Sequence, residues 1–149
     1  MICTFLGHRD TPSSIQPYLL ALLRNLIEKE GASRFFVGNQ GAFDHMATGI
    51  LRQLKREYSH IYFTIVLAYL PTKQKTSYVA DCDTLFPEEL ETSPPRFAID
   101  KRNHWLINRA DTVITYVVRS GGNAARFKKL AEKRGKRVIN LPDSMDALF

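Results

Sequence analysis

Two glycine-rich segments carry the residues whose types and spacing favour binding of an anion. Each follows a short apolar run and leads into a segment with helical periodicity. Glycines in such a turn expose backbone N–H groups, and the dipole of the following helix attracts negative charge. We therefore predict ligand binding by Gly38, Asn39, Gln40, Gly41 and Asp44 in the first turn and by Ser120, Gly121, Gly122 and Asn123 in the second. A plain glycine turn, with Asn123 as a helix cap, is the alternative for the second segment.

Cationic and amide side chains near other strand ends add further candidates. Asn103 interrupts an otherwise apolar helical stripe, and a buried amide requires hydrogen-bond partners, either loop backbone or a ligand. Arg102 is adjacent and reaches the same crevice, and arginine suits bidentate contact with phosphate or carboxylate. Pairing of Arg9 with Asp10 in a surface turn is the alternative to a ligand role for Arg9. The predicted binding residues of this group are Gly7, His8, Arg9, Arg102 and Asn103.

Two carboxylates, Asp44 and Asp100, are candidates for catalysis if the protein is an enzyme. Cleavage of a glycosidic bond passes through an oxocarbenium-like state and needs a carboxylate near the anomeric carbon. Asp44 falls in a first helical turn, where capping free amides and accepting from a ribose hydroxyl are the alternatives to acting as a base. No metal site and no cofactor are predicted, because Cys3 and Cys82 form no CxxC pair and Cys82 has no His or Cys partner at ligand spacing.

Strands alternate with helices along the chain, and this alternation must position the candidates. We expect a Rossmann-like three-layer α/β sandwich with a mainly parallel sheet of about five strands, formed by residues 1–149 as a single domain. Ligands of such sheets bind at the carboxyl ends of the strands. A long loop over 69–93, with a helical turn near 88–91, interrupts the alternation. The expected strands are 2–6, 35–37, 61–68, 112–118 and 137–141, and the expected helices are 12–30, 43–58, 94–110 and 123–134.

The charge and composition of the chain limit its expected partners and its expected location in the cell. The 149 residues carry a net charge of +6, which favours anionic partners. The chain shows no signal peptide and no apolar run long enough to span a membrane, so we expect a soluble cytoplasmic protein. Related folds often pair through exposed helices, so a homo-oligomer is one expected assembly. A basic cluster is either a solvated helix face or a nucleic-acid patch, and it comprises Arg126, Lys128, Lys129, Lys133, Arg134, Lys136 and Arg137.

The motifs together resemble the SLOG superfamily, named for the Smf/DprA and LOG proteins, and in particular its small stand-alone YpsA-like members. The resemblance rests on Cys-Thr-Phe-Leu-Gly-His-Arg at 3–9, on the glycine turn 38–44, on Lys-Arg-Asn at 101–103 with Asn-Arg-Ala-Asp-Thr-Val-Ile at 108–114, and on Ser-Gly-Gly-Asn at 120–123. It spans nearly the whole chain and is weakest over 69–93. It implies a Rossmann-like fold and a nucleotide or nucleotide-derived ligand at the glycine turns.

The same resemblance suggests three candidate functions. Binding or sensing of a nucleotide is the leading expectation. A nucleotide N-glycosidase or (deoxy)ribosyltransferase is the first alternative, but LOG hydrolases use Pro-Gly-Gly-x-Gly-Thr-x-x-Glu, whereas this chain has Ser120 in place of the proline and lacks the Gly-Thr and the glutamate. Binding of single-stranded nucleic acid through the basic C-terminal helix is the second alternative, because DprA-like members bind single-stranded DNA.

Overall fold

The protein is built on a parallel β-sheet. The computed structural model describes residues 1–70 and 83–145. Within them the sheet has six strands in the order β4-β3-β2-β1-β5-β6, and every neighbouring pair is parallel. The Rossmann-like α/β prediction is therefore confirmed, with one strand more than expected. The strands are β1 (Ile2–Gly7), β2 (Arg34–Val37), β3 (Tyr62–Val66), β4 (Asp83–Leu85), β5 (Thr112–Tyr116) and β6 (Arg137–Asn140).

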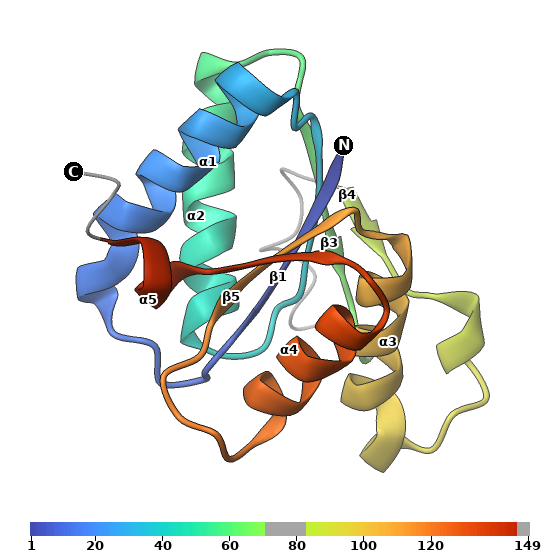
Figure 1. Cartoon of the computed structure of the whole chain (residues 1–149). Helices are drawn as coiled ribbons and strands as arrows, with labels where there is room; N and C mark the ends of the chain where they lie inside the picture. Colours follow the sequence, from blue (N-terminus) through green and yellow to red (C-terminus); the bar gives the residue numbers. More distant parts are fainter. Residues whose placement is uncertain (71–82, 146–149) are drawn as a thin grey trace.

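Helices cover both faces of the sheet (Figure 1). One face packs against α1 (Gln16–Glu30) and α2 (Ala42–Glu57), and the other against α3 (Ala98–Arg109) and α4 (Asn123–Lys133), while α5 (Leu141–Ser144) is a single turn after β6. The predicted apolar stripe of α1 is buried, because leucines at helical spacing face the sheet. The core on this side includes Leu19, Leu23, Phe5, Phe35 and Phe43.

The expected loop over 69–93 is corrected in part. Strand β4 lies within it and pairs with β3, and the backbone N–H of Leu67 also donates to the carbonyl of Leu85 at 2.8 Å. All three β4 residues are exposed, so the strand has no buried face. The sequence therefore shows no alternation of apolar and polar residues that would have indicated a strand here. The helical turn expected near 88–91 is present as a 3-10 turn at Glu88–Leu90. Residues 71–82, which include Cys82, lie outside the described residues.

The strand order creates a switch point between β1 and β5. From β1, the chain adds β2, β3 and β4 on one side, whereas β5 and β6 lie on the other. The connections after β1 and β5 therefore diverge to opposite faces and leave a crevice at the carboxyl ends of these strands. Across the described ranges, no helix combines the length and the apolar character needed to cross a bilayer.

Candidate functional site

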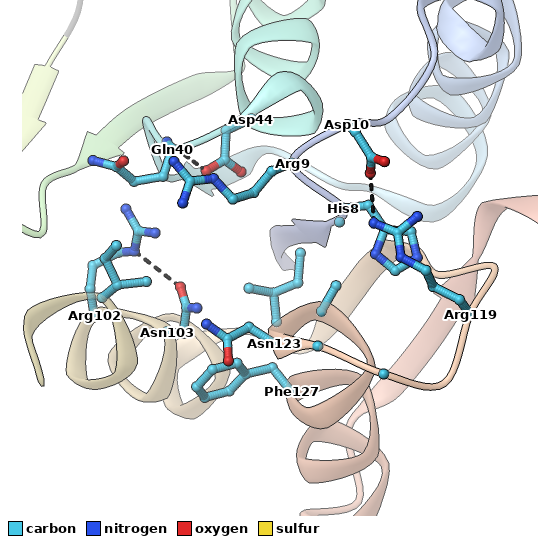
Figure 2. A pocket seen from close by; sticks show the side chains of 16 residues that line it. His8, Arg9, Asp10, Gln40, Asp44, Arg102, Asn103, Arg119, Asn123 and Phe127 are labelled. Carbon is cyan, nitrogen blue, oxygen red and sulfur yellow. Dashed lines mark hydrogen bonds and ion pairs between the residues drawn. The ribbon is translucent and has the colours of Figure 1, made fainter.

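A cleft of about 600 Å³ occupies this crevice. Four segments line it: the turn after β1, the turn after β2 with the start of α2, the start of α3, and the turn after β5 with the start of α4. Figure 2 shows their side chains converging on one space. The lining residues are Leu6, Gly7, His8, Arg9, Asp10, Gln40, Asp44, Ile99, Arg102, Asn103, Arg119, Gly121, Gly122, Asn123, Ala124 and Phe127.

The two glycine turns end in the same backbone conformation. Gly41 has φ 93° and ψ 174°, and Gly122 has φ 91° and ψ 178°, and each directly precedes a helix. Residues with a side chain rarely adopt such positive φ values, so glycine is required at both positions. Gly41 also lies against Arg9, because a Cβ there would lie 2.9 Å from the Arg9 Cα, and the N–H of Ala42 donates to the Arg9 carbonyl at 2.9 Å.

The turn after β5 presents unpaired donors. No side chain caps α4, and the backbone N–H groups of Asn123, Ala124 and Ala125 find no acceptor among the described residues. Gly121, Gly122 and Asn123 are exposed on the cleft side of the helix N-terminus. Such free N–H groups at the positive end of a helix dipole favour an anion.

Arg102 and Asp44 are the buried charged pair of the cleft. Arg102 is 2% exposed and Asp44 is 7% exposed, yet no ion pair joins them. Both converge over Gly38, where a Cβ would lie 2.7 Å from Arg102 Nη1 and 2.7 Å from Asp44 Oδ2. Arg102 Nη1 donates to the Val66 carbonyl at 3.3 Å, and Asp44 Oδ2 accepts from the Gln40 N–H at 3.0 Å. The absence of a side chain at Gly38 therefore makes room for both groups.

Burial shifts the pKa values of Asp44 and Arg102 in opposite directions. Burial raises the pKa of Asp44, and the Arg102 charge and the Gln40 N–H oppose that shift. Burial lowers the pKa of Arg102, and the Asp44 charge opposes it. Arginine stays protonated at neutral pH because its ordinary pKa is far higher. The cleft therefore contains a buried cation whose charge is only partly balanced by protein.

The side-chain amides of Asn103 and Asn123, beside this pair, already accept hydrogen bonds from protein groups. Asn103 Oδ1 accepts from Arg102 Nε at 3.1 Å, so its partner is a side chain and not the loop backbone considered above. In Figure 2, Asn103 rises from α3 between Arg102 and Asn123. Asn123 Oδ1 accepts from Arg126 Nη2 at 3.3 Å. Arg126 also donates to Asp100 Oδ1 at 2.6 Å, which joins α3 to α4 outside the cleft lining.

His8 and an ion pair border the opposite side of the cleft. His8 is 5% exposed, and its Nε2 accepts from the Val118 N–H at 3.0 Å. Asp10 pairs with Arg119 at 2.7 Å, and not with Arg9 as the alternative for that segment supposed. In Figure 2 this pair lies beside His8, on the side of the cleft away from Arg102.

The structure brings most of the predicted binding residues together. Ten line the cleft: Gly7, His8, Arg9, Gln40, Asp44, Arg102, Asn103, Gly121, Gly122 and Asn123. Gly38 lies directly beneath Arg102 and Asp44, and Gly41 lies behind Arg9. Asn39 does not line the cleft and forms part of the turn, where Gln40 Nε2 donates to its Oδ1 at 3.5 Å. Ser120 lies in a separate shallow hollow beside Lys128 and Lys129.

Of the two carboxylates, only Asp44 lines the cleft, since Asp100 is engaged with Arg126. The cleft lining also includes residues that were not predicted from the sequence, namely Asp10, Arg119 and the apolar residues Leu6, Ile99, Ala124 and Phe127. The helical spacing of Ile99 to Asn103 was the one signal that placed Ile99 on the same face. Among the described residues, no group of three or more His, Cys, Asp or Glu side chains is placed to hold a metal ion.

Comparison with known proteins finds likeness in fold. No family model matches the chain. No curated protein matches it in sequence. The chain is similar to the solved structure of DNA processing protein A (DprA) from Streptococcus pneumoniae, with a TM-score of 0.66 and 15% identity over 91% of this chain and 48% of that one. It thus spans about half the length of that protein.

A second DprA structure gives the same result. DprA from Helicobacter pylori, studied for its single-stranded DNA binding mode, is similar with a TM-score of 0.65 and 14% identity over 97% of this chain and 71% of that one. The chain therefore shares the Rossmann-like fold found in DprA, as the sequence resemblance implied. At these identities the likeness concerns the fold.

Proposed function

We propose that this chain is a single nucleotide-binding domain of the SLOG superfamily, related to its YpsA-like members, which binds or senses a nucleotide or nucleotide-derived ligand in the cleft. The observation that carries the proposal is the buried Arg102, which has no ion-pair contact with a carboxylate of residues 1–70 or 83–145 and faces a space also reached by the free N–H groups of α4. A buried, partly unbalanced cation costs free energy that an anionic ligand would recover. The cleft volume of about 600 Å³ falls in the range of small-molecule sites, roughly 300–1,000 Å³.

The proposed assignment follows the chemistry of each segment. Gly121, Gly122 and Asn123 hold a phosphate at the start of α4, with Arg9 contributing from the other side of the cleft. The turn from Gly38 to Asp44 holds ribose or a second phosphate. Arg102 and Asn103 orient the ligand from α3.

A charge placed on the α4 turn tests this assignment. Gly121 has an ordinary φ, and no atom lies within 4 Å of a Cβ built there, so Gly121→Asp adds a negative charge without strain. Gly121→Asn is the neutral variant of the same shape. Gly49→Asp, in α2 with equally open space, is the matched control for charge.

Calorimetry with a panel of nucleoside mono-, di- and triphosphates provides the measurement. Wild type binds at least one member, Gly121→Asp binds it at least tenfold more weakly because like charges repel across a short distance, and Gly121→Asn and Gly49→Asp bind it nearly as wild type does. Absence of binding by wild type across the whole panel would refute the proposal.

Cleavage or transfer at a nucleotide glycosidic bond is the enzymatic alternative. Asp44 is its best catalytic candidate, because it lines the cleft and accepts only one hydrogen bond among the described residues, whereas Asp100 is paired with Arg126. Release of free base from nucleoside monophosphates by wild type, lost in Asp44→Asn, would support this function. An inert wild type would exclude it for the substrates tested.

Binding of single-stranded nucleic acid is the second candidate, and the fold likeness to DprA supports it. The basic cluster supports it less, because Arg126, Lys128, Arg134 and Arg137 already contact protein groups. Lys129 and Lys133 are exposed on α4. An affinity for single-stranded DNA that falls steeply with salt and is reduced by reversing these two charges would support this candidate.

A further inference from the structure

The segment that leads from β5 to the glycine turn is held by side chains. Sheet pairing ends at Tyr116 on the β1 side and at Thr115 on the β6 side. Beyond these points the Val117 N–H donates to Asn140 Oδ1 at 2.9 Å, and the Val118 N–H donates to His8 Nε2 at 3.0 Å. Two side-chain acceptors therefore fix the course of the backbone just before Arg119 and the turn at Gly121.

The contact with Val118 sets the protonation of His8. A backbone N–H only donates, so the Nε2 that accepts from it must carry no proton, and the neutral ring bears its proton on Nδ1. The ring is held firmly, because His8 is nearly buried, lies edge-to-face with Tyr116 at 6.2 Å, and donates its own backbone N–H to the Tyr116 carbonyl at 3.2 Å.

We propose that His8 is a positioning residue for the ligand-binding turn: its neutral ring holds Val118, and its protonation releases the segment 118–122 and weakens ligand binding. The inference rests on the proposed function, because the turn it positions is the proposed phosphate site. Protonation turns Nε2 into a donor that faces another donor at 3.0 Å, so the two groups must separate.

The surrounding charges favour the neutral ring at neutral pH. Burial lowers the pKa of His8, the Arg119 charge lowers it further, and Asp10 opposes both. Tyr116 and Arg119 face the ring from the β5 side, and Asp10 from its own turn. Release is therefore expected only below the ordinary histidine value of about 6.5.

The direction in which ligand affinity changes with pH distinguishes a positioning role of His8 from a purely electrostatic effect of its charge. A protonated His8 adds positive charge at the cleft, so charge alone would strengthen the binding of an anion as the pH falls. Protonation of Asp44 across the cleft acts in the same direction, because it removes a negative charge. Loss of the Val118 contact acts in the opposite direction.

Substitutions of His8 separate these effects. His8→Gln supplies an uncharged acceptor at a reach similar to that of Nε2, and His8→Leu supplies bulk without an acceptor. His60→Gln, at an exposed histidine, is the matched control. The probe is the nucleotide that binds wild type best in the calorimetric panel, and circular dichroism and urea unfolding verify that each variant is folded.

At neutral pH, His8→Leu is expected to bind about tenfold more weakly than His8→Gln, as expected when a buried donor loses its acceptor. As the pH falls below about 6.5, the ratio of wild-type to His8→Gln affinity decreases, and this ratio cancels the titration of the ligand phosphate and of Asp44. A constant ratio, a rising ratio, or His8→Leu binding as tightly as His8→Gln does would overturn the proposal.

Ligand-free NMR spectra keep this test distinct from that of the proposed function. The Val118 amide resonance is expected to shift with the titration of His8 in wild type and to stay constant in His8→Gln. If it does so and no nucleotide binds, the proposed function fails while the coupling of His8 to Val118 holds. If it stays constant in wild type, the coupling is refuted whether or not a nucleotide binds.

Discussion

Gly38→Ala probes the centre of the cleft with a single methyl group. Gly38 is buried and has an ordinary φ, so alanine introduces no backbone strain. The new Cβ would lie 2.7 Å from Arg102 Nη1, 2.9 Å from Arg102 Cζ and 2.7 Å from Asp44 Oδ2. Normal contact distances are about 3.5–4.0 Å, so the two charged groups must move by roughly 1 Å.

The contacts of these two groups set the magnitude. Arg102 Nη1 donates to the Val66 carbonyl at 3.3 Å, close to the limit of a hydrogen bond, and a displacement of this size breaks it. A hydrogen bond to a charged group contributes about 1.5–3 kcal/mol. We expect the free energy of unfolding to fall by about 2 kcal/mol, and nucleotide affinity to fall about tenfold to a hundredfold because the displaced Arg102 no longer orients the ligand.

Urea unfolding and calorimetry measure both effects. Gly49→Ala is the control, because no atom lies within 4 Å of its Cβ and alanine in a helix raises stability by about 1 kcal/mol relative to glycine. Its nucleotide affinity is expected to equal that of wild type. If Gly38→Ala binds nucleotide as tightly as wild type, Arg102 and Asp44 do not hold the ligand in the way proposed.

Three other substitutions address the remaining charges. Arg102→Met is expected to reduce nucleotide affinity more than tenfold in calorimetry and to lower the free energy of unfolding by about 3 kcal/mol, because it leaves the buried Asp44 carboxylate without the nearby cation and removes the hydrogen bonds to Val66 and Asn103; unchanged stability would contradict this. Burial raises the pKa of Asp44 above its unfolded value, so its ionisation destabilises the fold as the pH rises. Asp44→Asn is therefore expected to be more stable than wild type to urea at neutral pH, with the difference shrinking as the pH falls toward the ordinary aspartate value of about 3.9; a difference that grows would refute this sign. Asp100→Asn breaks an exposed ion pair with Arg126 and is expected to cost less than about 1 kcal/mol and leave nucleotide affinity unchanged, whereas lost affinity would place Asp100 in the site.

Much of the fold follows from local patterns. The buried strands β1, β2 and β5 are short apolar runs, and the α1 stripe repeats leucine at helical spacing, so each was predictable from neighbouring residues. Strand β4 was not, because Asp83–Leu85 is exposed and pairs with β3 through backbone groups that any sequence possesses. A strand stabilised in this way leaves no signal in hydrophobic periodicity.

The location of the site could be predicted because it follows from a general property of parallel sheets. The ion pairs around the site could not, because each depends on two particular side chains meeting. Parallel strands bring their carboxyl ends to one edge, and this rule placed Gly38 and Gly121 at one cleft. Ion pairs such as Asp10 with Arg119 and Asp100 with Arg126 depend on side-chain geometry between distant segments. The first of these joins residues 109 positions apart, which no local pattern reveals.

Chemical-shift mapping of the isotope-labelled protein with a nucleoside monophosphate tests the cleft most directly. We expect saturable shifts of the amides of Gly38, Asn103, Gly121 and Gly122, because these lie around the proposed phosphate and ribose positions. No saturable shift with any nucleotide, or shifts confined to the exposed side of α4 around Lys129 and Lys133, would contradict it.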